Sequence, residues 1–93
     1  MISVRIQEEV LDYLRKLPPQ PRHRLKEAIK ALAKESGDIK ALTEEIEGFL
    51  LLRVGSYRVI FEYEMIDGER TITCVFDGSR RWIYEAFQSR FTE

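Results

Sequence analysis

The chain has 93 residues, and its 15 lysines and arginines nearly balance its 16 aspartates and glutamates, for a net charge of -1. This length suits one domain, covering residues 1–93. The near-neutral charge excludes a global field that would draw the whole chain to nucleic acid or to an anionic membrane.

Cysteine content and the length of apolar runs indicate the cellular compartment of the protein. A single cysteine, Cys74, excludes a disulfide framework and is typical of a reducing compartment. No basic region followed by an apolar stretch opens the chain, so we expect no signal peptide. The longest unbroken apolar run, residues 49–52, is far too short to span a bilayer. We therefore expect a cytoplasmic protein with no membrane partner.

A strand and a helix are predicted at the N-terminus. Residues 2–7 alternate apolar and polar side chains, which is the period of a half-buried strand. From Glu8 to Leu17 the apolar residues recur at intervals of three and four, as on the buried face of a helix. The Pro18-Pro19 pair ends this helix, because proline breaks the helical hydrogen-bond pattern.

A second helix follows after a short link. Pro21 is well placed to open it, since the missing N–H would be unpaired there in any case. Gly37 is the expected C-terminal cap, and residues 38–48 are predicted as a polar connection. Two helices joined so closely should form an antiparallel hairpin. The apolar stripe of the second helix consists of Leu25, Ala28, Ile29 and Leu32.

Three strands are predicted in the C-terminal half. Residues 49–54 and 57–65 flank Gly55-Ser56, which suits a type II′ hairpin turn. Asp67-Gly68 is a strong type I′ signal and joins the second strand to residues 71–77. We therefore predict an α+β fold, with an N-terminal strand and a two-helix hairpin packed on an antiparallel sheet that ends in a three-stranded meander.

The two turns predict a register and therefore two faces of the sheet. In this register Arg53 lies opposite Arg58, Val59 opposite Phe76, and Arg58 opposite Asp77. The inner face, beneath the helices, is expected to carry Leu50, Leu52, Val54, Tyr57, Val59, Phe61, Tyr63, Ile72, Cys74 and Phe76. The outer face is expected to carry Phe49, Leu51, Arg53, Arg58, Ile60, Glu62, Thr71, Thr73, Val75 and Asp77.

The facing arginines are the first candidate site. Like charges directly opposite each other are destabilising, so Arg53 and Arg58 should bind an anion or a carboxylate. One interpretation is a phosphate clamp, because the planar guanidinium matches phosphate oxygens. The other is an ion pair with Asp77 or Glu62, and structural ion pairs are commoner in proteins than active sites.

A second candidate site follows the last predicted strand. Arg80 and Arg81 stand beside Trp82 and Tyr84, and basic groups mixed with aromatics suit single-stranded nucleic acid. Tyr84 is also a candidate proton carrier, since nearby arginines lower the pKa of a phenol. Alternatively, Trp82 and Tyr84 close the core while both arginines are solvated.

The second predicted helix carries a basic stripe, which is either a binding surface or a solvated helix face. One histidine, His23, and one cysteine make neither a metal site nor a convincing catalytic triad. We therefore expect no metal and no cofactor. The stripe consists of Arg22, Lys26, Lys30 and Lys34.

The order of elements resembles the RelE/ParE superfamily of toxins from type II toxin–antitoxin systems. The sequence LRVGSYRVIFE, residues 52–62, carries the resemblance most specifically, followed by residues 74–81 and by Ile83-Tyr84. RelE-like members dock in the ribosomal A site and cleave mRNA without a metal, by activating a ribose 2′-hydroxyl against the neighbouring phosphate. ParE-like members inhibit DNA gyrase. The resemblance implies that an antitoxin holds this chain inactive.

The resemblance also implies roles for individual residues. Arg58 would stabilise the charged transition state, and Arg80, or Arg81 beside it, would hold the phosphate or assist the leaving 5′-oxygen. Tyr84 would activate the 2′-hydroxyl or stack on a base, and Arg53 would flank the site. The basic stripe on the second helix would dock on ribosomal RNA, whose phosphates favour clustered lysines.

This sequence departs from RelE in the first hairpin strand. Phe49 and Leu51 stand where RelE has lysines, and the outer face also carries Ile60 and Val75. An exposed apolar patch of this kind indicates a protein partner, which is either the antitoxin or a second copy of the chain. The sequence therefore leaves two hypotheses: a ribosome-dependent endonuclease, and a gyrase inhibitor or non-catalytic antitoxin-binding relative.

Overall fold

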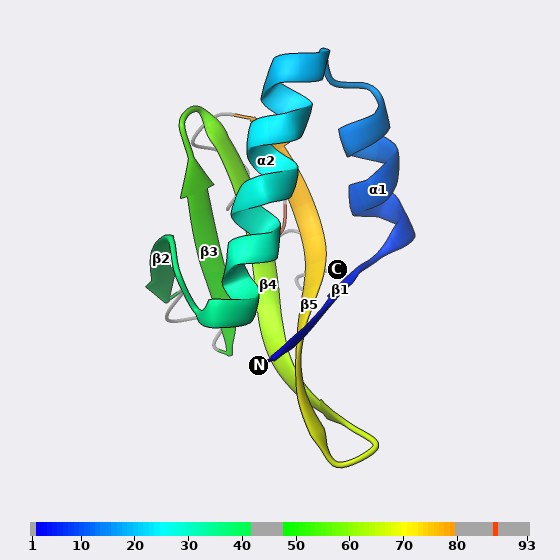
Figure 1. Cartoon of the computed structure of the whole chain (residues 1–93), viewed down its shortest axis with the longest axis vertical. Coiled ribbons are helices and arrows are strands. Elements are labelled where there is room, and N and C mark those ends of the chain that lie inside the picture. The colour runs from blue at the N-terminus through cyan, green and yellow to red at the C-terminus, as the bar shows by residue number, and fades with distance from the viewer. Residues whose placement is uncertain (1, 42–47, 80–86, 88–93) are drawn as a thin grey trace.

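The computed structural model describes residues 2–41, 48–79 and 87 (Figure 1). A five-stranded sheet is covered on one face by two helices, which confirms the predicted α+β fold. The elements are β1 (Ser3–Ile6), α1 (Glu8–Arg15), α2 (Pro19–Ala31), the short 3₁₀ helix η1 (Leu32–Lys34), β2 (Asp38–Ala41), β3 (Phe49–Val54), β4 (Tyr57–Ile66) and β5 (Glu69–Ser79).

The strand order is β1-β5-β4-β3-β2, so the first strand lies beside the last. β1 runs parallel to β5, whereas the other pairs are antiparallel, and the sheet is therefore mixed rather than wholly antiparallel as predicted. The pairing places Val4 opposite Ile72 and Ile6 opposite Cys74. The β1–β5 pairing widens the apolar face of the sheet by one strand. This contact joins the two ends of the sheet's sequence, so local sequence patterns do not encode it.

The two helices lie side by side as the predicted antiparallel hairpin (Figure 1). α2 begins at Pro19 rather than Pro21, because both prolines fit in a first turn whose N–H groups need no partner. The expected cap at Gly37 is wrong. The helical path ends in η1, and Glu35 takes the left-handed conformation with φ +54°.

The segment predicted as a polar connection contains a strand. β2 pairs with β3, with Ile39 opposite Leu52 and Asp38 opposite Arg53. Four residues are too short to show a clear period in the sequence, and pairing with a neighbouring strand determines their conformation. Residues 42–47 lie outside the described part of the chain.

The main core fills the space between the helices and the sheet. Cys74 is fully buried in it, and burial raises the pKa of its thiol to about 12. The thiol is therefore neutral and behaves as a small apolar side chain. The buried members of this core are Val10, Leu14, Leu25, Ile29, Leu32, Leu52, Val59, Phe61, Ile72 and Cys74.

Both predicted hairpin turns are present. Gly55 has φ +60°, and the β3–β4 register places Arg53 opposite Arg58 as predicted. Asp67 and Gly68 have φ +51° and +80°, which are the two left-handed positions of a type I′ turn.

The predicted register fails part-way along β4 and β5. Phe61 lies opposite Cys74 as expected, but Ile60 lies opposite Phe76, so Val75 is an extra residue in a β-bulge. Beyond the bulge Asp77 pairs with Val59 rather than Arg58. Because one inserted residue reverses the alternation of faces, Asp77 turns to the helix side and Phe76 turns to the outer face.

The outer face carries a second core, here called the outer apolar cluster. It consists of Ile60, Val75 and Phe87, packed by Phe49, Leu51 and Phe76. The ring of Phe87 lies 5.1 Å from that of Phe49 and 5.4 Å from that of Phe76. Ile60 and Val75 are thus buried, and the expectation of an exposed apolar patch at these two residues is wrong.

Candidate functional site

The facing arginines are held in different ways. Arg53 forms a bidentate ion pair with Asp38, whose Oδ2 and Oδ1 accept from Nε and Nη2 at 3.0 Å each. The predicted carboxylate partners were Asp77 and Glu62. Asp38 takes this place because the pairing of β2 with β3 sets it directly opposite Arg53. The sequence patterns did not predict β2, and for this reason they did not predict Asp38 as the partner of Arg53.

Arg58 is held by the backbone of its own hairpin. Its Nη1 donates to the carbonyl oxygens of Gly55 and Tyr57, at 2.7 and 2.9 Å. Within the described ranges no carboxylate forms an ion pair with Arg58. The side chain is half-buried, so its charge is fixed at the β3–β4 turn. A guanidinium has five N–H donors, and those not used by the turn suit an anion.

The other predicted catalytic residues, Arg80, Arg81 and Tyr84, lie outside the described residues. The described strand that leads to them ends at Ser79. Ser79 pairs with Tyr57, and Gly78 pairs with Arg58. The backbone therefore reaches residue 79 beside the first residues of β4, where Arg58 stands.

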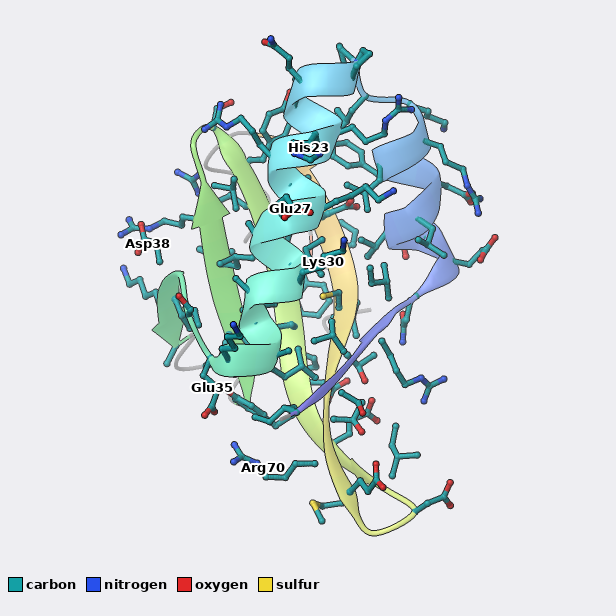
Figure 2. The ribbon with its side chains drawn as sticks, viewed as in Figure 1. His23, Glu27, Lys30, Glu35, Asp38 and Arg70 are labelled. Atoms are coloured by element: carbon teal, nitrogen blue, oxygen red, sulfur yellow. The ribbon has the colours of Figure 1, made fainter. Side chains whose placement is uncertain are left out.

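The basic stripe is less uniform than the sequence pattern indicates. Arg22 is half-buried, whereas Lys26, Lys30 and Lys34 are exposed, and Lys34 belongs to η1 rather than α2. Lys30 forms an exposed ion pair with Glu27 at 3.4 Å, and both lie on the solvent side of α2 (Figure 2). A binding role for this stripe stays a prediction.

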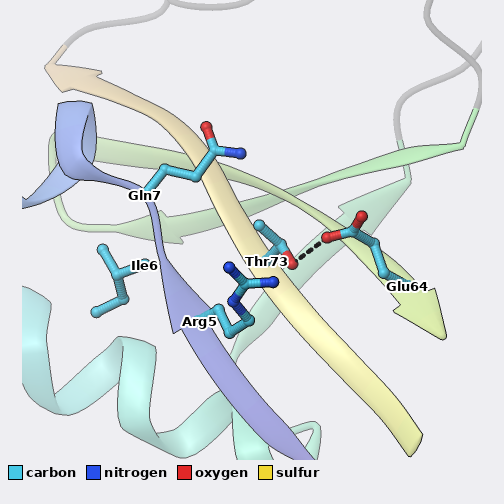
Figure 3. Close-up of a pocket in the computed structure, with 5 residues that line it drawn as sticks. All are labelled: Arg5, Ile6, Gln7, Glu64 and Thr73. Carbon is cyan, nitrogen blue, oxygen red and sulfur yellow. Dashed lines mark hydrogen bonds between the residues drawn. The ribbon is translucent and has the colours of Figure 1, made fainter. Parts of the chain in front are cut away.

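A small polar pocket of ≈ 170 Å³ opens on the outer face and was not singled out from the sequence. Arg5 and Gln7 come from β1 and the residue after it, and Thr73 and Glu64 come from β5 and β4 (Figure 3). The Thr73 hydroxyl donates to the Glu64 carboxylate. Only the parallel pairing of β1 with β5 brings these residues together, so no local signal predicts the pocket.

Burial and the Glu64 charge raise the pKa of Glu62, which lies two residues before Glu64 on the same strand. Asp77, the other carboxylate that the sequence offered as a partner for the arginines, is also a titratable group with a raised pKa. It is only 9% exposed, and burial and the nearby Glu9 charge raise the pKa of its carboxyl to about 7. Its Oδ2 has no hydrogen-bond partner within the described part of the chain.

Comparison with known proteins adds three similar structures. One is a structure of the toxin–antitoxin complex RelBE2 from Mycobacterium tuberculosis, with 27% identity, a TM-score of 0.70, and coverage of 85% of this chain and 98% of that chain. A RelE–RelB complex from Pyrococcus horikoshii matches with 25% identity and a TM-score of 0.67, covering 85% and 94% of the two chains. The chain belongs to the RelE/ParE superfamily of toxins.

The third similar structure is a YoeB/ParE toxin from Agrobacterium tumefaciens. It has the same fold, with a TM-score of 0.69 and coverage of 86% of this chain and 100% of that chain, but only 9% identity. No protein-family model and no curated protein sequence matches the chain. The assignment of this toxin to its superfamily therefore depends on the fold and on the two RelE-containing complexes.

None of the described helices could span a bilayer. Within the described ranges no group of three or more His, Cys, Asp or Glu residues is arranged to hold a metal ion. Phe49 and Leu51 are packed in the outer apolar cluster and bring no charge to this part of β3.

Proposed function

We infer that this chain is a RelE-like toxin, a ribosome-dependent mRNA endonuclease that a partner antitoxin holds inactive. Two of the similar structures are complexes of a RelE toxin with its antitoxin, at 27% and 25% identity, whereas the YoeB/ParE toxin is 9% identical. The two complexes support a RelE-like toxin with an antitoxin partner.

The observation that carries the proposal is the state of Arg58. Its guanidinium is fixed by two backbone carbonyls at the β3–β4 turn, and no described carboxylate neutralises it. A fixed cation that needs no rearrangement is what stabilises charge developing on a phosphate in a transition state. We therefore assign to Arg58 the role of stabilising the negative charge on the phosphorus centre in the transition state of cleavage.

The proposed reaction needs two further groups. The ribose 2′-oxygen attacks the phosphorus, the bond from phosphorus to the 5′-oxygen breaks, and a 2′,3′-cyclic phosphate and a 5′-hydroxyl result. Tyr84, as its phenolate, is the proposed acceptor of the 2′-hydroxyl proton. Arg80 or Arg81 is the proposed partner that stabilises the charge on the leaving 5′-oxygen, which takes its proton from water. Arg53 flanks the site with its charge already balanced by Asp38.

A second candidate function has one specific observation in its favour. Phe49 and Leu51 pack in the outer apolar cluster, so the first hairpin strand offers no lysine to a phosphate or a proton. A gyrase inhibitor, or a non-catalytic relative that binds only its antitoxin, does not need a lysine to bind a phosphate or to transfer a proton. A supercoiling assay with purified gyrase, at toxin concentrations that block translation, separates this function from mRNA cleavage.

The decisive experiment uses purified ribosomes programmed with a defined mRNA, with primer extension to map cleavage. The wild-type chain should cut the mRNA in the A site, and Arg58→Ala should cut at a rate lower by roughly 10² to 10³. Arg15→Ala is the matched control, since Arg15 is exposed on α1 and its ion pairs among the described residues are with Glu8 and Asp12 of the same helix. Intact mRNA with both the wild type and Arg58→Ala, from folded protein, contradicts the proposal.

A further inference from the structure

We propose that a hollow between α1 and β5 is a docking site for an arginine side chain of a protein partner. The hollow measures ≈ 410 Å³ and is here called the α1–β5 hollow. It is separate from the β3–β4 turn that holds Arg58, and it does not depend on whether the chain cleaves mRNA. Its lining residues are Glu9, Asp12, Tyr13, Lys16, Phe76 and Asp77.

The β-bulge creates the key feature of the hollow. Because Val75 is the extra residue, Asp77 pairs with Val59 and faces the helices instead of the outer surface. Asp77 is 9% exposed, and its Oδ2 has no hydrogen-bond partner in the described ranges. Buried carboxyl oxygens are almost always paired in folded proteins, so an unpaired one at the wall of an open hollow indicates a missing donor.

The charges around Asp77 specify the sign of the ligand. On α1, Glu9, Asp12 and Lys16 lie at spacings of three and four residues, so they share the helix face that borders the hollow. On β5, the neighbouring Cys74 is neutral. With Asp77 ionised, the lining carries the carboxylates of Glu9, Asp12 and Asp77 against the ammonium of Lys16. Asp12 is already paired with Arg15 at 2.9 Å, so one negative charge remains in excess. Such a hollow repels phosphate and attracts a cation, so it is not an RNA-binding surface.

The aromatic lining favours a guanidinium over other cations. Tyr13 borders the hollow from α1, and a guanidinium stacks on an aromatic ring while its fork binds a carboxylate. Phe76 also borders the hollow, but its ring packs on Phe87 in the outer apolar cluster. It is also less strongly hydrated than an ammonium, so it enters a half-buried site more readily. A metal ion fits less well, because no cluster of three metal-ligating side chains is found among the described residues.

Binding of an arginine side chain should be linked to the protonation of Asp77. The raised pKa of Asp77, about 7, means that much of the carboxyl is protonated at neutral pH in the unliganded protein. A bound guanidinium favours the ionised form and should lower this pKa. By reciprocity, arginine binding must become tighter as the pH rises through this range.

The test uses the full chain, with N-acetyl-arginine amide as the probe and N-acetyl-citrulline amide as a neutral probe of the same shape. In an NMR titration the arginine probe should shift the amide signals of Glu9, Tyr13, Lys16 and Asp77, and the citrulline probe should not. Asp77→Asn keeps the shape and should weaken binding about tenfold. Asp67→Asn, at the exposed β4–β5 turn, is the matched control and should bind as the wild type does.

The carboxyl carbon signal of Asp77 gives the second measurement. Its pKa should fall when the arginine probe is bound, and the affinity should rise between pH 5.5 and 8 in the wild type but not in Asp77→Asn. Equal binding of both probes, unchanged binding by Asp77→Asn, or an unchanged pKa overturns the proposal. If Asp77→Asn does not fold, the wild-type pKa measurement decides alone. No ribosome is involved, so this result is independent of the mRNA cleavage assay.

Discussion

Arg53 and Arg58 face each other across the β3–β4 hairpin, with the first bound to a carboxylate and the second bound to backbone carbonyls. Two unscreened arginines in this register would repel each other. The ion pair with Asp38 removes much of this repulsion and leaves the Arg58 charge for a ligand. The two arginines of the hairpin therefore have different roles: Arg53 is structural and Arg58 is a candidate catalytic residue. This difference depends on β2, which supplies Asp38.

Replacing Asp38 should lower the free energy of unfolding, because Arg53 then loses its carboxylate partner. Asp38→Asn breaks the bidentate pair, whose partners are half-exposed, so we expect a loss of about 0.5–1 kcal/mol in the free energy of unfolding. The loss should shrink in an Arg58→Ala background, because the repulsion is then absent. Urea unfolding of the single and double variants measures both values. An equal loss in the two backgrounds would mean that the two arginines do not interact.

The stability of the chain should depend on pH through Asp77. The folded state binds the Asp77 proton more tightly than the unfolded chain, since the pKa rises from 3.8 to about 7 on folding. The free energy of unfolding should therefore fall as the pH rises from about 4 to 7, and then level off. Glu62, whose pKa is also raised, acts in the same direction.

Asp77→Asn isolates the Asp77 contribution, because the amide cannot ionise. Above pH 7 the variant should be more stable than the wild type, and its stability should change less between pH 4 and 7. Thermal unfolding followed by circular dichroism at several pH values measures this. A wild type whose stability rises steadily over the same interval would show that Asp77 is ionised in the folded state.

Phe87 should prove to be a core residue. It is 3% exposed and packs on Phe49 and Phe76 in the outer apolar cluster. Phe87→Ala should cost about 3 kcal/mol of stability and expose Ile60 and Val75, with increased binding of a hydrophobic dye. Met65→Ala is the matched control, because Met65 is 67% exposed and its loss should change stability by less than about 0.5 kcal/mol. Similar effects of both changes would place Phe87 outside the core.

The Cys74 thiol should not react in the folded protein. It is fully buried, and its pKa of about 12 keeps it in the unreactive protonated form at pH 8. A thiol-specific reagent should therefore modify it only at the rate at which the chain opens, and rapidly in denaturant. Fast modification under native conditions would show that β5 is not covered by β1 and the helices in solution.

The local patterns of the sequence predicted most of the fold. Alternating side chains indicated β1, the spacing of three and four indicated both helices, and Gly55 and Asp67-Gly68 fixed two hairpins. These signals succeed because each reflects interactions within a few residues, such as a turn that requires a positive φ. They also placed Arg53 opposite Arg58, since the register follows from the turn.

The sequence by itself therefore determined the α+β fold, the β3–β4 hairpin and the position of Arg58 on it. Only the tertiary structure decided that β2 exists, that Asp38 pairs with Arg53, and that the bulge at Val75 turns Asp77 toward the helices. These features depend on contacts between segments far apart in the chain, whose energies no local pattern records. A single extra residue in β5 is sufficient to exchange the two faces, because the side-chain period of a strand is two.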